Sequence, residues 1–310
     1  MSFVDLVAGA IIPVVALLAA GFILNTRFLP NRGLWHGLER LSYFVFTPAL
    51  FISSISSADL TVVPFGSMLI TLVVPLSLTA LVIAALKRPL RATGPDLTSL
   101  IQGGIRMNTY MGLIISQAIG GSQGVAAFAL ACAVVVPTVN LISVTGLSIY
   151  GASPQGGRAG RPSVVASLAK NPFLLASLAG IALNVAPFDL PRVVAEPIAL
   201  FAEPAMVIGT LVSGAALKFA VTSKEIVHIS AASIIKLLLL PLATAAMGAA
   251  LGLEGAALAA VVTITAIPTA PSAYVLATIM GGNARLMANI TGVQTVLSIV
   301  TLPMLLFALL

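Results

Sequence analysis

Ile267-Pro268-Thr269-Ala270-Pro271-Ser272-Ala273-Tyr274 lies near the middle of an apolar segment that extends from residue 255 to residue 280. Proline lacks a backbone N–H and clashes with the preceding turn of a helix, so two prolines three residues apart prevent a continuous helix here. Non-helical backbone at membrane depth is tolerated only where it is buried in protein or lines a water-filled cavity. We therefore expect a broken helix that lines a cavity.

The composition identifies the class of protein. Of the 310 residues, 59% are hydrophobic and 8% are charged, and the mean hydropathy is +1.12, whereas a soluble domain carries roughly 25% charged residues. A soluble globular protein is therefore excluded. Apolar runs of about 20 residues recur, as membrane-spanning helices require, whereas barrel strands alternate apolar and polar residues in runs of about ten. The sequence predicts an all-α polytopic membrane protein.

The apolar segments divide the chain into ten predicted membrane-spanning helices. The connections between them are short, so no separate catalytic or receptor domain is expected. The predicted spans cover residues 3–24, 38–57, 63–86, 98–119, 124–149, 164–186, 193–217, 226–250, 255–280 and 285–309.

Basic residues gather in alternate connections. Twelve of them follow odd-numbered spans, whereas the opposite connections contain five acidic residues and only one basic residue, Arg192. The positive-inside rule then places both termini outside, in the periplasm of a bacterium, and the basic connections in the cytoplasm. The protein is accordingly expected in the inner membrane. The twelve are Arg27, Arg32, Arg40, Lys87, Arg88, Arg91, Arg158, Arg161, Lys170, Lys218, Lys224 and Arg285, and the five acids are Asp5, Asp59, Asp189, Glu196 and Glu254.

The remaining composition gives no sign of a cofactor or of nucleic acid. The single cysteine, Cys132, lies in an apolar run, so neither a disulfide framework nor a cysteine metal motif is expected. The net charge of +6 follows from the topology of the connections. We expect no metal site, no cofactor and no nucleic-acid partner.

Three pairs of motifs suggest an internal repeat. Pro75 and Pro241 lie in similar apolar contexts, Pro48-Ala49 matches Pro204-Ala205, and Gly120-Gly121 matches Gly281-Gly282, at offsets of 166, 156 and 161 residues. Because each repeat contains five spans, the two repeats would have opposite orientations in the membrane, as in many secondary transporters. We predict repeats at 1–150 and 164–310, joined by a cytoplasmic linker at 151–163.

The fourth span resembles the ninth in having an interrupted centre. It reads Gln102-Gly-Gly-Ile-Arg106-Met-Asn108-Thr-Tyr-Met-Gly112, and the 161-residue offset places Asn108 opposite Thr269. Broken helices of this kind cross near the bilayer midplane, where their N-terminal ends favour an anion. The predicted substrate-binding residues are Arg106, Asn108, Thr109, Tyr110, Lys236, Pro268, Thr269, Pro271 and Ser272.

Arg106, Lys236 and Glu203 are the charged residues that do not fit a connection. Ionisable groups at this depth are costly and are often functional. Arg106 and Lys236 either attract an anion or serve structurally, Arg106 by pairing and Lys236 by reaching a cytoplasmic vestibule. Glu203 either carries a coupling proton or is an exposed acid at the start of a seventh span that begins near Pro204.

Other polar residues are assigned to structure. His36 and His228 lie near the ends of connections and are expected at the membrane interface. Asn140, Asn289 and Gln294 are expected mainly to form hydrogen bonds between helices.

In these segments the sequence resembles the auxin efflux carrier family, whose members include plant auxin exporters and bacterial organic-acid carriers. One departure is that many family members have a proline just after the glycine of the fourth span, where this chain has Leu113 and Ile114; Gly103, Gly104 and Gly112 are expected to shape that break instead. The resemblance rests on Leu41-Ser-Tyr-Phe-Val-Phe-Thr-Pro48-Ala-Leu-Phe-Ile-Ser-Ser-Ile, Asp59-Leu60, Arg106-x-Asn108-Thr109-Tyr110-x-Gly112, Gly209-x-x-x-x-Gly214-Ala-Ala-Leu-Lys218, Lys236-Leu-x-x-x-Pro241 and Leu302-Pro303.

This resemblance implies an elevator-type carrier with a fold like those of sodium/proton antiporters and bile-acid symporters. The first, second, sixth and seventh helices would form a scaffold, and the third to fifth and eighth to tenth helices a transport domain. It also implies that Asn108 and the prolines of the crossover contribute to binding. Many such carriers form homodimers through the scaffold.

The sequence therefore predicts a non-enzymatic secondary transporter of small organic anions, such as malonate, malate or an aromatic carboxylate, coupled to protons, to sodium or to neither. A sodium-coupled symporter of the bile-acid type is an alternative, although acids are scarce near the crossover. A channel or a membrane sensor with a transporter fold is another alternative. An intramembrane enzyme is disfavoured because the catalytic motifs His-Glu-x-x-His and Gly-x-Ser-x-Gly are absent from the sequence.

Overall fold

The computed structural model describes residues 12–57, 64–152, 172–186, 190–217 and 225–310. Within these ranges every regular element is a helix, which confirms the predicted all-α class. Parts of several predictions lie outside the described residues: the start of the first span, most of the 151–163 linker, the start of the sixth span, and the charged residues Asp5, Asp59, Arg158, Arg161, Lys170, Asp189, Lys218 and Lys224.

The helices follow the predicted apolar segments, and several segments contain two or three elements. Short π-helical segments, labelled η, continue or join α-helices within a span. In chain order the elements are α2 (Ile12–Ile23), η2 (Leu24–Phe28), α3 (Arg32–Leu41), η3 (Ser42–Phe46), α4 (Thr47–Ser56), α5 (Phe65–Ala85), α6 (Gly94–Ile105), α7 (Thr109–Tyr150), α9 (Pro172–Asn184), α10 (Arg192–Ala202), α11 (Ala205–Ala215), α12 (Ile226–Ile234), η6 (Ile235–Leu239), α13 (Leu240–Ala250), α14 (Gly255–Ala266), α15 (Ser272–Met280) and α16 (Ala284–Leu309).

Five helical stretches are long and apolar enough to cross a membrane. They are 65–85, 94–150, 192–215, 226–250 and 284–309, and shorter apolar helices occur at 12–28, 175–184 and 255–266. The described part of the chain therefore has the helices of a membrane-embedded protein.

The second span begins earlier than the hydropathy indicates. The side chain of Asn31 accepts hydrogen bonds from the N–H groups of Gly33 (2.9 Å) and Leu34 (3.2 Å), which fixes the start of α3. The first two turns of α3 are mainly exposed, with Trp35 their buried residue. A boundary drawn from apolar content alone misses these polar turns, so the predicted start at residue 38 was six residues too late.

The predicted fourth and ninth spans each contain a break in the helix. α6 ends at Ile105 and α7 begins at Thr109, whereas α14 ends at Ala266 and α15 begins at Ser272. α6 and α14 each contain 12 residues, and both their starts and their ends differ by 161 positions in the sequence. In both helices the residue after the last turn is extended, with ψ of 162° at Arg106 and 148° at Ile267.

The three glycines expected to shape the break in the fourth span lie inside helices. A Cβ added to Gly103 would lie 2.8 Å from the side chain of Ile290, and one added to Gly104 would lie 2.3 Å from Ile83. At Gly112 the added atom would lie 2.1 Å from the ring of Phe128. These glycines therefore permit close packing of neighbouring helices, and the break follows at residues 106–108.

α7 changes direction at Gly121, where φ is +55° and ψ is −144°. This left-handed conformation is readily accessible to glycine. It separates the second half of the predicted fourth span from the predicted fifth span, close to the predicted boundary between residues 119 and 124. Gly281, in the matching motif, also has a positive φ, of +78°.

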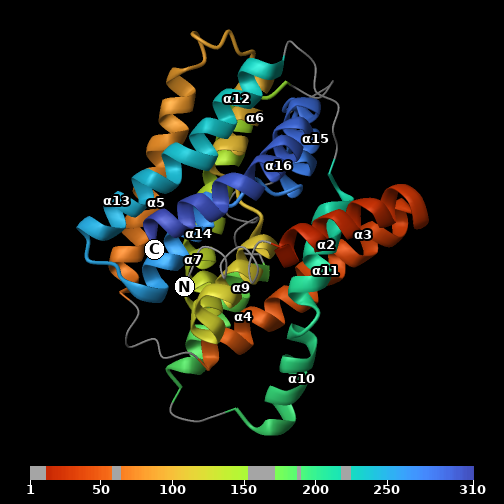
Figure 1. Ribbon diagram of the computed structural model, residues 1–310, viewed down its shortest axis with the longest axis vertical. Coiled ribbons are helices and arrows are strands. Elements are labelled where there is room, and N and C mark those ends of the chain that lie inside the picture. The colour runs from red at the N-terminus through yellow and green to blue at the C-terminus, as the bar shows by residue number, and fades with distance from the viewer. Residues whose placement is uncertain (1–11, 58–63, 153–171, 187–189, 218–224) are drawn as a thin grey trace.

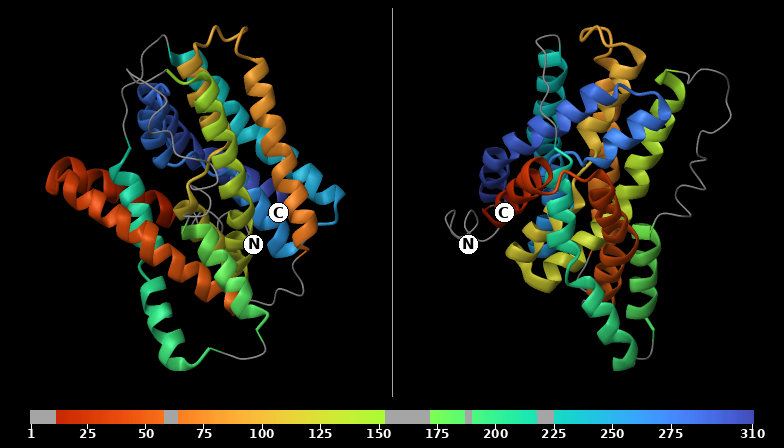
Figure 2. Two further views of the ribbon diagram at one scale, coloured as in Figure 1. Left: turned by 180° about the vertical axis from the view of Figure 1, so that it is seen from behind. Right: turned by 90° about the vertical axis from the view of Figure 1, so that its right-hand side faces the viewer.

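The helices form two groups that meet along α7. Figure 1 and the rear view in Figure 2 show α2, α3, α4, α10 and α11 on one side and α5, α12, α13 and α14 on the other. In the first group α2 packs closely on α11, because Gly21 lies against the backbone of Leu211 and Gly214 against that of Leu18. α7 contacts members of both groups, including α4, α11, α5 and α14. Residues 106–110 therefore lie where the two groups face each other.

Candidate functional site

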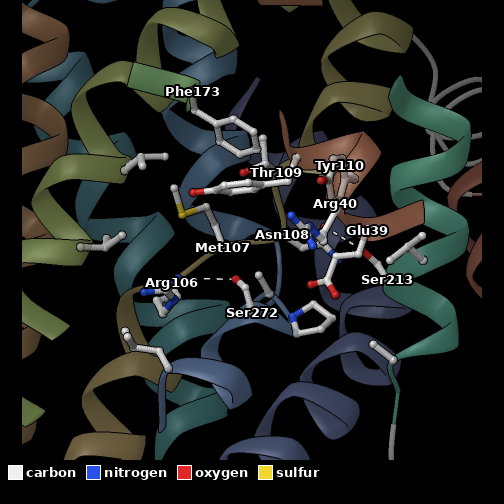
Figure 3. Close-up of a pocket in the computed structure, with 18 of the residues that line it drawn as sticks. Glu39, Arg40, Arg106, Met107, Asn108, Thr109, Tyr110, Phe173, Ser213 and Ser272 are labelled. Atoms are coloured by element: carbon white, nitrogen blue, oxygen red, sulfur yellow. Dashed lines mark hydrogen bonds between the residues drawn. The ribbon is translucent and has the colours of Figure 1, made fainter. Parts of the chain in front are cut away.

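A cavity with a volume of about 410 Å³ lies at the break between α6 and α7. Figure 3 shows side chains from both broken spans around it. Six of the nine predicted substrate-binding residues line it: Arg106, Asn108, Thr109, Tyr110, Pro271 and Ser272. The other lining residues are His36, Glu39, Arg40, Tyr43, Phe44, Met107, Val136, Val139, Asn140, Phe173, Val212, Ser213, Ala216, Ala270 and Leu276.

The two broken segments touch through their backbones. The N–H of Asn108 donates to the carbonyl of Pro268 over 2.8 Å. The Asn108 side chain is 2% exposed, and its Oδ1 accepts from the N–H of Met111 (3.5 Å) and from the hydroxyl of Ser213 (3.4 Å). Asn108 thus caps α7 and joins both the ninth span and α11.

Arg106 supplies a positive charge to the cavity. Its guanidinium donates to Oδ1 of Asn140 over 3.1 Å and to the hydroxyl of Ser272 over 3.5 Å. Both partners are neutral, and the ion pairs found among the described residues, His36–Glu39 and Arg285–Glu225, do not include it. Among the described residues no carboxylate lies within ion-pair distance of Arg106, although Glu39 also lines the cavity.

The N-termini of two helices add partial positive charge to the cavity. α7 begins at Thr109 and α15 begins at Ser272, and both residues line the cavity. The first N–H groups of a helix lack intrahelical acceptors and carry the positive end of the helix dipole. Together with Arg106, these ends create a site that favours a bound anion.

Pro268 and Thr269 lie behind the cavity wall. Thr269 is fully buried, its N–H donates to Oε1 of Gln294 over 3.1 Å, and its hydroxyl donates to the carbonyl of Gly103 over 3.0 Å. Pro268 contributes its carbonyl to Asn108. Both residues therefore hold the crossover together and are absent from the cavity lining.

Lys236 also lies away from the cavity. Its side chain is fully buried, and Nζ donates to the carbonyl of Thr265 over 2.9 Å. Thr265 belongs to the last turn of α14, where carbonyls lack intrahelical donors and a positive charge complements the helix dipole. In this arrangement Lys236 caps a half-helix.

Glu203 is exposed between α10 and α11 and does not line the cavity. The helix is interrupted at Glu203-Pro204, and the seventh span has helix on both sides of the interruption. This differs from a span that begins only at Pro204. The exposure of Glu203 matches the expectation of a solvated acid.

Several lining residues were not singled out by the sequence. Asn140 was expected to join helices, and it does so through Arg106 while also lining the cavity. Tyr43 and Phe173 form an aromatic wall with ring centroids 5.0 Å apart. The spacing of these two aromatic residues in the sequence does not distinguish them from ordinary core residues. Ser213 could have been noticed as a polar residue in the glycine-containing motif of the seventh span.

His36 lies in the middle of α3, whereas His228 lies near the start of α12. His36 is exposed at the cavity rim, with Nδ1 lying 3.6 Å from Glu39 Oε2. His228 is close to the start of α12, where its Nε2 lies 3.0 Å from the carbonyl of Leu90. Asn289 donates to Glu225 over 3.1 Å.

Comparison with protein families locates a known domain in the second half of the chain. Residues 158–306 match the family described as membrane transport protein, which is the domain of the auxin efflux carriers. The chain carries an auxin efflux carrier family domain. A search of curated proteins found no match.

The auxin efflux carrier family domain includes the ninth span and therefore half of the crossover. The matched range covers Thr269, Pro271 and Ser272, whereas Arg106 and Asn108 precede it. Among the described residues no group of three or more His, Cys, Asp or Glu side chains is placed to hold a metal ion. The chemistry of the cavity is thus that of hydrogen bonding, positive charge and aromatic contact, and residues 158–306 of the same chain match a family of membrane transport proteins.

Proposed function

We propose that the protein is a secondary active transporter of small organic anions, with its substrate bound at the crossing of the fourth and ninth spans. The observation that carries the proposal is Arg106, whose charge faces a cavity of about 410 Å³ and is bonded to the neutral groups of Asn140 and Ser272. A buried or partly buried charge is costly unless a partner compensates it. A substrate carboxylate would provide that partner.

The lining of the cavity favours an acid with an apolar or aromatic body. A carboxylate at Arg106 would lie near the N-termini of α7 and α15, and the rest of the molecule would contact Tyr43, Phe173 and the valines of α7. Offset or edge-on contact between aromatic rings adds favourable energy beyond the area that it buries. The substrate class is therefore small carboxylates, including auxin-like aromatic acids, and short acids such as malonate or malate belong to the same test set.

The architecture that best explains the cavity is a pair of inverted five-helix repeats, at 1–150 and 164–310, with ten spans. The equal lengths of α6 and α14 and their constant offset of 161 residues support it. In this proposal the first, second, sixth and seventh spans form the scaffold, and the other six spans form a transport domain that slides past it. Such alternating access is the usual mechanism of transporters built from inverted repeats.

The proposed orientation follows from the basic connections. His36 and Arg40 lie on the rim of the cavity and belong to α3, the polar first part of the second span. By the positive-inside rule this segment would face the cytoplasm, which supports the proposal of a carrier open to the inside with both termini outside. A bacterial inner membrane is the proposed location.

The proposal is tested by uptake of labelled benzoate, malonate and malate into proteoliposomes containing the purified protein. The Arg106→Gln variant removes one charge-assisted contact, worth about 1.5–3 kcal/mol, so its KM for a transported acid should rise by about ten- to a hundredfold. Arg88→Gln removes the same charge from an exposed connection and serves as the matched control.

Asn108→Ala tests the geometry of the crossover in the same assay. This variant loses the side-chain cap of α7 and the contact with Ser213. Uptake should fall strongly. Parental uptake kinetics in both the Arg106→Gln and Asn108→Ala variants would refute the proposed site, and absence of uptake of all three acids by the parent would refute the substrate class.

A further inference from the structure

Gln294 is a fully buried residue in the middle of α16 whose side-chain amide forms hydrogen bonds through both its nitrogen and its oxygen. Its Nε2 donates to the carbonyl of Gly103 over 2.9 Å, and its Oε1 accepts from the N–H of Thr269 over 3.1 Å. Gly103 belongs to α6, and Thr269 lies in the break that follows α14. One side chain therefore connects the two broken spans.

The two groups that Gln294 binds lose their helical partners at the breaks. The carbonyl of Gly103 would accept from the N–H of residue 107 in a continuous helix, but α6 ends at Ile105. The N–H of Thr269 would donate to the carbonyl of Thr265, but α14 ends at Ala266 and that carbonyl accepts from Lys236. One carbonyl and one N–H thus remain at the crossing.

A carboxamide is suited to this pair because it has one donor group and one acceptor group at the same end. Unsatisfied backbone groups cost several kcal/mol in the apolar core of a membrane. The Thr269 hydroxyl supplies a second donor to the Gly103 carbonyl over 3.0 Å. Gly103, Thr269 and Gln294 therefore form a closed set of three hydrogen bonds.

The set lies close in sequence to the residues that line the cavity. Gly103 precedes Arg106 by three residues, and Thr269 precedes Ser272 by three residues. Arg106 and Ser272 are themselves hydrogen-bonded over 3.5 Å. Any shift of one break relative to the other would change this distance, although Gln294 is absent from the cavity lining.

We propose that Gln294 is a positioning residue, which sets the register of the two broken spans and thereby the geometry of the anion site. The proposal rests on the transport function proposed above for that site. Gln294 would remain bonded to both breaks while the transport domain moves, because Gln294 and its two partners, Gly103 and Thr269, all belong to that domain.

The Gln294→Glu variant gives a test with a built-in control. A protonated carboxyl group has one acceptor and one donor, so at low pH it can replace both bonds of the amide. After deprotonation it has acceptors only and would face the Gly103 carbonyl without a proton between them. Uptake of benzoate and malonate, divided by that of the parent at the same pH, should be close to one at pH 5 and at least tenfold lower at pH 8.

The matched control is Ser298→Ala. Ser298 is buried on α16 one turn beyond Gln294, and its hydroxyl donates to the carbonyl of Thr295 in its own helix. This variant should retain a parental uptake ratio at both pH values. If Gln294→Glu acted by a general loss of packing in α16, Ser298→Ala should also lower uptake. If it acts through the crossover register, Ser298→Ala should not lower uptake, because it leaves the hydrogen bonds of Gln294 in place.

Hydrogen exchange of peptides that contain residues 106–110 and 268–272 tests the inference without a substrate. At pH 8 both peptides should exchange faster in Gln294→Glu than in Ser298→Ala. The Gln294→Leu variant lacks both bonds at either pH, so parental uptake together with unchanged exchange of both peptides in this variant would overturn the positioning role. If the parent transports neither acid, the proposed function fails, and the exchange comparison alone decides the role of Gln294.

Discussion

The contact between Gly209 and Tyr110 offers a sharp test of movement between the two helix groups. Gly209 belongs to α11, and Tyr110 lies in the first turn of α7 and lines the cavity. A Cβ added to Gly209 would lie 2.2 Å from Cδ1 and 2.5 Å from both Cε1 and Cγ of the Tyr110 ring. Ordinary contacts at a Cβ begin near 3.4 Å, so the ring or the helix must move by about 1 Å, the overpacking that cores resist.

The Gly209→Ala substitution should raise the free energy of one state of the carrier relative to the other. Overpacking of this kind costs about 1–3 kcal/mol, which corresponds to about a 5- to 150-fold change in an equilibrium constant. If α7 slides past α11 during transport, the ring leaves Gly209 in the other state, and that state avoids the clash. The variant should therefore depopulate the arrangement in which the cavity is open.

The assay is labelling of a cysteine introduced at Ala216, an exposed residue of the cavity lining. Its reaction with a membrane-impermeant maleimide should slow by about fivefold or more in Gly209→Ala. Gly37→Ala serves as the control because an added Cβ there meets no atom within 4 Å. The further change Tyr110→Ala removes the ring and should restore the rate.

Two results would refute this reasoning. Equal labelling rates in Gly209→Ala and the parent would show that the contact is not specific to one state. A slow rate that persists after Tyr110→Ala would show that the added methyl group acts on something other than the ring.

Two further predictions concern groups that lie away from the cavity. Lys236→Met should lower stability by about 1–3 kcal/mol, because the Thr265 carbonyl loses its donor, and a lower thermal unfolding temperature in detergent would show it; unchanged stability with tenfold weaker binding of a carboxylate would instead identify Lys236 as a ligand. Asp96→Ala should cost about 1–2 kcal/mol, because Asp96 completes the capping box of α6 with Thr93 and accepts from Asn283 over 2.7 Å. Adding Asn283→Ala to that variant should lower the unfolding temperature by less than the sum of the two single changes, and full additivity would contradict a shared bond.

The break in the ninth span was predictable from the sequence, because proline acts directly on its own backbone. The break in the fourth span was located only approximately, since no proline marks it and its glycines serve helix packing. Their role depends on the neighbours Ile290, Ile83 and Phe128, which come from other parts of the chain. The spacing of residues in the sequence does not show which side chains become neighbours in the fold.

The candidate site was predicted in part for a similar reason. Arg106 and Asn108 stand out because polar residues are rare in apolar segments, and both line the cavity. Lys236 stands out equally but binds a helix end in the core. Tyr43 and Phe173 line the cavity, yet aromatic residues are so common in packed cores that nothing in their sequence context distinguished them.

The bond from the N–H of Asn108 to the carbonyl of Pro268 joins main-chain atoms. Any residue except proline at position 108 retains that donor, so this one contact does not depend on the side chain at position 108. Selectivity can therefore be redesigned by varying Thr109, Ser272 and the aromatic wall in combinatorial libraries. Variants with altered substrate range could then be recovered from a frame whose backbone contact is common to every member of the library.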